Sequence, residues 1–307
     1  MTSGPARLAA PAKLNLFLRV LSRDTDGYHG IETVFCLVDL ADELVAERRD
    51  GTGATIEVEG PDVGPAEQNL AVRAARAVLD ATGNRFGVHL RLTKRIPVRA
   101  GLGGGSSDAA AALVLVNHLA SRAVPRHELL QIAARLGSDV AYFLSGAPLA
   151  LGWNRGERFL ALPPLPVAPV LLLVPPVPVA TAEAYGWVDA ARQSGGRRGA
   201  VALDLDALST WGDIGRMAGN DFESPVFGRH PEVRAAFEAL VGTRPLVCRM
   251  SGSGSTLFAV YRSVRDRDDA GMMLGRKHGR LIPAATLGAP LPGPAAAGEL
   301  PGASGPG

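Results

Sequence analysis

A glycine-rich segment at residues 101–108 combines residue types that can hold a phosphate group. Four glycines between positions 101 and 105 are followed by two serines, Asp108 and an alanine-rich stretch up to residue 119. Glycine lets the backbone approach a ligand closely, and the free N–H groups at a helix N-terminus attract anions. The serines and Asp108 supply oxygens that could cap such a helix. The segment therefore predicts an anion-binding loop that leads into a helix.

Two familiar phosphate-binding motifs do not fit this segment. No Gly-Lys-Ser/Thr sequence closes it, as a P-loop requires, and Ser106 stands where Gly-x-Gly-x-x-Gly needs its third glycine. A flexible connection followed by a capped helix explains the same residues without any ligand. The segment alone leaves both interpretations open, so other parts of the chain must decide between them.

The composition narrows the class of protein. With 307 residues, the chain is long enough for two domains of ordinary size. The formal net charge is +2 and the basic residues are scattered, which argues against a nucleic-acid partner and against binding to anionic membranes. The uncharged stretch 162–180 contains seven prolines, so a membrane-spanning helix is not expected there. These features favour a small-molecule substrate.

The cysteines and the N-terminal residues indicate a reducing compartment. Cys36 and Cys248 lie far apart in apolar surroundings, and no Cys/His cluster has metal-ligand spacing. Buried free thiols are therefore expected. Lys13, Asn15 and Arg19 interrupt the N-terminal Leu/Phe pattern, which is not typical of a signal peptide. We expect a cytoplasmic protein that is a monomer or a homodimer.

Hydrophobic periodicity outlines the elements that must position these residues. Alternation over 11–21 predicts a strand that carries Lys13 and Asn15 on one face. The patterns predict helices at 69–82, 127–136 and 231–240, and strands at 88–93, 170–174, 245–250 and 257–261.

Proline-rich sequence suggests where the domains divide. A boundary at 163–169 separates a first domain, residues 1–165, from a second domain, residues 166–283. Beyond Pro283 the chain is almost entirely Pro, Gly, Ala and Ser, so residues 284–307 are predicted to be a disordered tail.

Three separated segments together resemble the three signature motifs of the GHMP small-molecule kinases. They are residues 11–15, the glycine-rich segment and residues 250–255. Four further stretches strengthen the resemblance: Asp-Gly-Tyr-His at 26–29, Gly-Ser-Asp-Val at 137–140, Thr-Ala-Glu-Ala-Tyr at 181–185 and Asn-Asp-Phe-Glu at 220–223. The resemblance implies an α+β fold with two domains. The N-terminal domain would be like domain 2 of ribosomal protein S5, and the C-terminal domain would be ferredoxin-like.

Within this family, the chain is most similar to members that act on a cytidine diphosphate-linked methylerythritol in the non-mevalonate isoprenoid pathway. The resemblance implies that ATP, with Mg²⁺, phosphorylates the hydroxyl at C2 to give the 2-phosphate and ADP. Kinases of mevalonate, homoserine or a sugar are the nearest alternative. Tyr28 and Tyr185 argue against them, because a small acyclic alcohol needs no stacking aromatic rings. A nucleotide-binding regulator without catalysis is a second alternative, and the presence of both Lys13 and Asp139 argues against it.

The resemblance assigns the ATP phosphates to backbone amides in the glycine-rich segment and to the helix that follows. The expected ATP-binding residues are Pro97, Val98, Arg99, Ala100, Gly101, Leu102, Gly103, Gly104, Gly105, Ser106 and Ser107. A second turn near the phosphates would contain Ser251, Gly252, Ser253 and Gly254. Ser107 could also reach the magnesium ion, although helix capping explains this serine equally well.

Lys13 and Asp139 match the catalytic pair of the family. Asp139 would accept the proton of the substrate hydroxyl or orient that hydroxyl, and Lys13 would stabilise the developing alkoxide. From local sequence alone, Asp139 would be a helix N-cap and Lys13 a solvated strand residue. Ala141 replaces a proline that is common in the family two residues after the aspartate.

Five residues match positions that hold the cytidylyl substrate: Asn15, Tyr28, His29, Lys94 and Tyr185. The two tyrosines would stack on the base, and His29 would pair with its edge. Asn15 would hydrogen-bond the substrate, or alternatively hold a neighbouring loop. Lys94 would lie near the nucleotide, although a solubilising charge at a strand end is an equal alternative.

Overall fold

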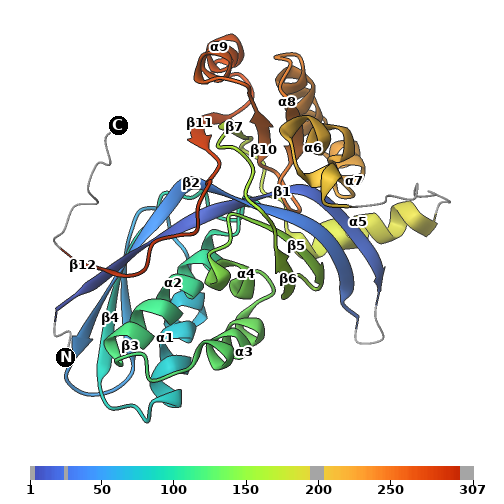
Figure 1. Ribbon diagram of the computed structural model, residues 1–307. Helices are drawn as coiled ribbons and strands as arrows, with labels where there is room; N and C mark the ends of the chain where they lie inside the picture. Colours follow the sequence, from blue (N-terminus) through green and yellow to red (C-terminus); the bar gives the residue numbers. More distant parts are fainter. Residues whose placement is uncertain (1–3, 24–26, 194–203, 298–307) are drawn as a thin grey trace.

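The computed structural model describes residues 4–23, 27–193 and 204–297, which form two sheets and the helices that cover them. A long ribbon made of β1 (Ala6–Arg23) and β2 (His29–Arg49) crosses the molecule (Figure 1). Helices α1 to α4 lie on one side of this ribbon, and the second sheet lies on the other with α6 to α9 (Figure 1). The chain therefore has the two-domain α+β architecture expected from the sequence.

The first sheet is built around the β1–β2 ribbon. Its strand order is β12-β1-β2-β4-β3, while β5 adds to β2 and β8 adds to β1. The other strands are β3 (Ala54–Glu59), β4 (Gly87–Thr93), β5 (Leu149–Asn154), β6 (Arg158–Ala161), β8 (Gly219–Asn220) and β12 (Ala295–Ala296). A register shift between Asn15 and Phe17 interrupts the pairing of β1 with β2. Such a bulge re-aims the side chains beside it.

Four helices cover the first sheet: α1 (Leu70–Ala81), α2 (Gly104–Leu119), α3 (Arg126–Leu136) and α4 (Val140–Ser145), with a 3₁₀ turn at Ala66–Gln68. The side chain of Asn69 accepts a hydrogen bond from Ala71 N–H and caps α1. Helix α2 is buried on almost every side and packs against α1, α4 and β1. Its run of alanines permits this close packing, because small side chains let neighbouring backbones approach.

The start of α2 differs from the sequence-based expectation. Its N-cap is Gly103, in the left-handed conformation with φ 72°, and no side chain caps the helix. Ser106, Ser107 and Asp108 lie within the helix rather than before it. The expected capping role was therefore wrong. The chain enters the helix through a backbone conformation that glycine adopts without strain. Because glycine has no side chain to cap the helix, the first N–H groups of α2 receive no side-chain hydrogen bond from the N-cap.

The second sheet has the ferredoxin-like order. Its strands in chain order are β7 (Pro169–Val174), β9 (Val247–Met250), β10 (Leu257–Val260) and β11 (Arg280–Ala285). Their spatial order is β11-β7-β10-β9, and every pairing is antiparallel. Helices separate β7 from β9 and β10 from β11, which gives the β-α-β-β-α-β arrangement. The helices are α5 (Thr181–Gln193), α6 (Trp211–Met217), α7 (Glu223–Arg229), α8 (Pro231–Val241) and α9 (Val264–Leu274), with a 3₁₀ turn at Asp206–Leu208.

The two halves share a hydrophobic core. Leu14 and Leu16 of β1 pack in one buried cluster with Val170, Leu172 and Phe258 of the second sheet. Because helix α2 and the second sheet both pack near β1, this strand is buried on both of its faces. Its polar residues Lys13 and Asn15 therefore face the protein interior rather than solvent. Among the described residues, no helix combines the length and the apolar character needed to span a bilayer.

The residues after β11 contradict the predicted disordered tail in part. Leu287 N–H donates to the Leu37 carbonyl, and Leu291 N–H donates to the Gly146 carbonyl. Strand β12 then pairs with the first residues of β1. Composition alone suggested disorder, but these backbone hydrogen bonds are independent of side-chain type. The remaining predicted tail, 298–307, lies outside the described residues.

Candidate active site

A cavity of about 1260 Å³ lies where the two halves of the molecule meet. Its lining combines residues of β1 and β2, the loop 97–106, the segment before α4, helix α5 and the turn 252–254. These segments are far apart in sequence. The fold therefore gathers at one place the separated motifs that the sequence singled out.

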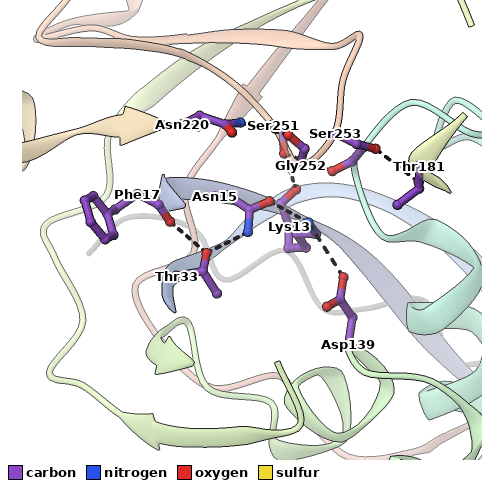
Figure 2. A network of polar contacts seen from close by, with 11 residues as sticks. Lys13, Asn15, Phe17, Thr33, Asp139, Thr181, Asn220, Ser251, Gly252 and Ser253 are labelled. Carbon is purple, nitrogen blue, oxygen red and sulfur yellow. Dashed lines mark hydrogen bonds and ion pairs between the residues drawn. The ribbon is translucent and has the colours of Figure 1, made fainter. Parts of the chain in front are cut away.

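Lys13 and Asp139 face each other in this cavity (Figure 2). Lys13 Nζ lies 3.7 Å from Asp139 Oδ2, and the lysine side chain is almost fully buried. Burial lowers the pKa of Lys13, while the Asp139 carboxylate opposes that shift. The N–O separation is longer than a normal hydrogen bond, so both groups keep capacity for a reacting hydroxyl.

Asn15 lies beside Lys13 on the same face of β1, as the alternation predicted. Its Oδ1 accepts a hydrogen bond of 2.6 Å from Lys13 Nζ, and its Nδ2 donates to Thr33 Oγ1 at 2.7 Å. Asn15 lines the cavity, but both ends of its amide already have protein partners. Thr33 belongs to β2 and has no sequence motif of its own, so it could not be predicted from the sequence.

The glycine-rich loop and the turn at 251–254 pack directly against each other. Ser251 Oγ donates to the Gly101 carbonyl at 3.0 Å, and Lys13 N–H donates to the Leu102 carbonyl at 3.0 Å. A Cβ on Gly101, where φ is +79°, would lie 2.1 Å from the Ser251 carbonyl oxygen. Glycine is therefore required at this position by close backbone approach as well as by φ.

The Asn-Asp-Phe-Glu motif at 220–223 holds the turn at 251–254 in place. Asn220 Nδ2 donates to the carbonyls of Met250 and Gly252, both at 2.8 Å. A carboxylate oxygen of Glu223 accepts from Met250 N–H at 2.9 Å. The sequence matched this motif to the family without a role for it, and the contacts now supply that role. Figure 2 shows Asn220 next to the turn, together with the Thr181–Ser253 hydrogen bond.

Ten of the eleven predicted ATP-binding residues, Pro97 to Ser106, line the cavity. Ser107 is buried in the first turn of α2 and is not among the lining residues. Among the described residues, neither Ser107 Oγ nor Asp108 Oδ1 has a hydrogen-bond partner, and both atoms are buried. Oxygen atoms of this kind are suitable ligands for Mg²⁺, and of these two residues Asp108 lines the cavity, so its carboxyl fits that ion.

Lys94 takes part in a buried ionic cluster that the sequence analysis missed. Its ammonium pairs with Asp42 and lies 2.9 Å from Asp108 Oδ2. Asp42 also accepts from the backbone N–H of Ile96 at 2.8 Å. Lys94 lines the cavity, but its ammonium already has the carboxyl groups of Asp42 and Asp108 as partners. The cluster ties the end of β4 to β2 and α2.

We expect Asp108→Asn to change how stability depends on pH. Burial raises the pKa of Asp108 to about 7; the Lys94 ammonium opposes this shift and the Asp42 carboxylate adds to it. A carboxyl group whose pKa is higher in the folded than in the unfolded protein stabilises the fold in its protonated form. That contribution to the free energy of unfolding is lost as the pH rises from 3.8, the ordinary pKa of the group, towards 7. Asparagine cannot ionise. The free energy of unfolding of the variant, relative to wild type, should therefore increase by about 2–3 kcal/mol between pH 5 and pH 8.

Urea unfolding of both ligand-free proteins at pH 5, 6.5 and 8 measures this difference. A difference in unfolding free energy that stays constant over the three pH values would show that the pKa of Asp108 in the folded protein is not raised into this range.

The aromatic residues expected at the base-binding end also line the cavity. The rings of His29 and Tyr185 stack with centroids 4.9 Å apart, and His29 Nε2 contacts Asp189 Oδ1 at 2.8 Å. Tyr28 is 61% exposed, and the Arg155 guanidinium lies 4.3 Å from the centre of its ring. Asp189 and Arg155 were not predicted from the sequence, because neither residue stands out by type or spacing.

Comparison with known proteins gives consistent matches across the chain. Residues 69–147 match the GHMP kinases N terminal domain, and residues 204–277 match the GHMP kinases C terminal domain. A 4-diphosphocytidyl-2-C-methyl-D-erythritol kinase of Solibacter usitatus (strain Ellin6076) is 42% identical over 267 residues, covering 85% of this chain and 83% of the relative. An enzyme of the same name from Symbiobacterium thermophilum is 40% identical over 271 residues, with coverages of 86% and 93%.

Solved structures agree with these matches. A crystal structure of 4-(cytidine 5′-diphospho)-2C-methyl-D-erythritol kinase superposes with a TM-score of 0.76 at 34% identity, covering 92% of this chain and all of the other. A homoserine kinase from Cytophaga hutchinsonii has a TM-score of 0.70 at 19% identity, over 96% of this chain and 98% of its own, which supports the fold alone. The chain thus belongs to the GHMP kinases, in the family of the 4-diphosphocytidyl-2-C-methyl-D-erythritol kinases.

Proposed function

We propose that this protein transfers the γ-phosphoryl group of ATP to the C2 hydroxyl of 4-(cytidine 5′-diphospho)-2-C-methyl-D-erythritol. The products are the 2-phosphate and ADP, in the synthesis of isoprenoid precursors. The observation that carries the proposal is the Lys13–Asp139 pair, which lies in one cavity with a glycine-rich loop and an aromatic pocket. The family membership of the chain supports the same conclusion.

Lys13 and Asp139 would act on the oxygen that attacks phosphorus. As the new O–P bond forms and the bond from phosphorus to the ADP oxygen breaks, the hydroxyl proton becomes acidic and passes to Asp139. An Asp carboxylate is a weak base towards an ordinary alcohol, so the transfer occurs late, when the O–P bond is largely formed. The Lys13 ammonium stabilises negative charge on the same oxygen. The 3.7 Å separation leaves both groups able to contact it.

The ATP phosphates would be bound by the loop 97–106 and by the N–H groups at the start of α2. Gly103 and Gly104 bring these N–H groups to the cavity wall without covering them by side chains. Mg²⁺, when bound with ATP, would neutralise phosphate charge, and we propose Ser107 as its protein ligand. The described residues contain no cluster of three acidic, His or Cys side chains that could hold a metal. Phosphate oxygens and water would therefore complete the coordination shell.

The cytidine end of the substrate would bind among Tyr28, His29 and Tyr185. Burial raises the pKa of Tyr185 to about 12, with a further contribution from Asp139, so this residue presents a neutral phenol ring. Base stacking on an aromatic ring contributes about 1–3 kcal/mol. These residues give the site a preference for a nucleotide-linked alcohol over a small acyclic one.

We expect Tyr185→Ala to raise the KM for the cytidylyl substrate about 10-fold while kcat changes less. Steady-state kinetics with saturating ATP measures both constants. Tyr185→Phe is the matched control, because it keeps the ring and should keep most of the affinity. An unchanged KM in Tyr185→Ala would remove this ring from the base-binding site.

An assay of ADP release, with the cytidylyl substrate and mevalonate compared at equal concentration, tests the proposed function directly. Turnover with the cytidylyl substrate alone is expected. A preference for mevalonate would replace the proposed substrate, and no turnover with any alcohol would favour a nucleotide-binding regulator. We also propose a cytoplasmic location, because Cys36 and Cys248 are free thiols and reduced cysteines are typical of that compartment.

A further inference from the structure

A chain of hydrogen bonds runs from the reaction centre into the sheet behind it (Figure 2). Lys13 Nζ donates to Asn15 Oδ1, Asn15 Nδ2 donates to Thr33 Oγ1 at 2.7 Å, and Thr33 Oγ1 donates to the Phe17 carbonyl at 2.7 Å. Thr33 lies at the far end from Asp139, and it is not among the cavity-lining residues of the described chain. It cannot touch a substrate in the cavity directly.

The direction of every bond in this chain is fixed by chemistry. A backbone carbonyl can only accept, so the single proton of the Thr33 hydroxyl points to Phe17. The same hydroxyl must then accept from Asn15, which identifies the group facing Thr33 as the amide NH₂. The amide oxygen therefore faces Lys13, whose ammonium can only donate. Reversing the amide would direct its NH₂ at the ammonium and leave both donors without an acceptor.

Burial and packing make Thr33 the anchor of the chain. Its side chain is fully buried, and Asn15 is only 1% exposed, so bulk water cannot replace either bond. Thr33 of β2 is the register partner of Gly152 in β5. A Cβ atom added to Gly152 would lie 3.3 Å from Thr33 Cγ2. The methyl group fits against the strand at this glycine, and the β-branched side chain has few rotamers. Its hydroxyl is therefore held towards Phe17, beside the bulge in β1.

We propose that Thr33 is a positioning residue for phosphoryl transfer: its hydroxyl fixes the amide of Asn15, and the amide fixes the ammonium of Lys13. The inference rests on the proposed function, in which Lys13 contacts the reacting oxygen. Asn15 Oδ1 holds the ammonium at 2.6 Å, whereas the carboxylate of Asp139 is 3.7 Å away. We call the hydrogen bonds from Thr33 through Asn15 to Lys13 the tether. Without the tether, the Lys13 ammonium can move towards Asp139 and form a close ion pair with the carboxylate that the substrate hydroxyl needs.

Thr33→Val tests the proposal, because it removes the hydroxyl and keeps the branched shape and the methyl at Gly152. We expect kcat to fall about 10-fold, while KM for ATP and for the cytidylyl substrate each change less than about 2-fold. Thr33→Ser keeps the hydroxyl and should restore most of kcat. If Thr33→Val does not give folded protein by circular dichroism, Thr33→Ala carries the same prediction.

A double-mutant cycle separates positioning from general damage to the sheet. In an Asn15→Ala background the tether is already lost, so adding Thr33→Val should lower kcat by less than about 2-fold. An equal loss in both backgrounds, or wild-type kcat in Thr33→Val, would overturn the proposal. Wild-type enzyme is assayed first with the cytidylyl substrate. No turnover there contradicts the proposed function itself, whereas normal wild-type turnover with an unaffected Thr33→Val contradicts only the role of Thr33.

Discussion

Asp139→Asn is expected to lower kcat by about 10²-fold or more while ATP and the cytidylyl substrate still bind. Asparagine has the shape of aspartate but cannot take up the hydroxyl proton. The remaining amide oxygen can still accept from Lys13 Nζ, which lies 3.7 Å from the carboxylate in the structure. A 10²-fold loss corresponds to about 2.7 kcal/mol of transition-state stabilisation, which is typical for removal of a general base.

Two measurements check this expectation. Release of ADP under saturating substrates gives kcat, and isothermal titration calorimetry gives the affinities for ATP and substrate. Asp268→Asn is the matched control, because it makes the same chemical change at an exposed carboxylate of α9 outside the cavity lining. Turnover of Asp139→Asn near the wild-type value would remove Asp139 from the chemical step.

Lys13→Met is expected to reduce kcat by at least about 10²-fold, because it deletes the buried positive charge that we propose stabilises the reacting oxygen. Methionine keeps the length of the side chain, which limits the change in packing. Lys277→Met is the matched control, since Lys277 is exposed and lies outside the cavity lining. Thermal unfolding of both variants distinguishes loss of chemistry from loss of fold. A kcat within about 3-fold of wild type would contradict an electrostatic role for Lys13.

The pH dependence of the wild-type enzyme gives a second test of Lys13. Burial lowers the pKa of this lysine below its ordinary value of 10.5, with Asp139 acting in the opposite direction. The value of kcat/KM, which reports the free enzyme, should therefore fall on the alkaline side at a pH below 10.5, as the ammonium gives up its proton. The arginine side chain of Lys13→Arg stays positively charged throughout this pH range. The variant should be less active than wild type, but its activity should show no such alkaline loss.

The parts of the site that sequence predicted are those whose geometry is encoded locally. The glycine-rich loop needs backbone conformations that few residues other than glycine adopt, and Gly101 and Gly103 do have positive φ. Alternation along β1 placed Lys13 and Asn15 on one face, where they form a hydrogen bond. The order of four elements in the second sheet also agrees with the resemblance to the family.

Other parts of the site depend on contacts between distant positions, which no local pattern reveals. Asp42 meets Lys94 across 52 positions, and Asp189 meets His29 across 160. Nothing in the sequence around Asp42 or Thr33 distinguishes them from other polar strand residues. Composition was misleading for residues 287–296, because hydrogen bonds between backbones join this segment to the N-terminal half of the molecule.

The way the last described strand joins β1 has a consequence for how the protein folds. Ala296 pairs with Ala6, and Asn220 of β8 pairs with Leu18, so both late segments are added to the first strand of the chain. On the ribosome, the strand that carries Lys13 emerges early but gains these neighbours only after residues 220 and 296 have been made. Contacts of such high sequence separation slow folding and join distant segments into one cooperative unit. Strand β1 therefore completes its pairing late, although it is made first.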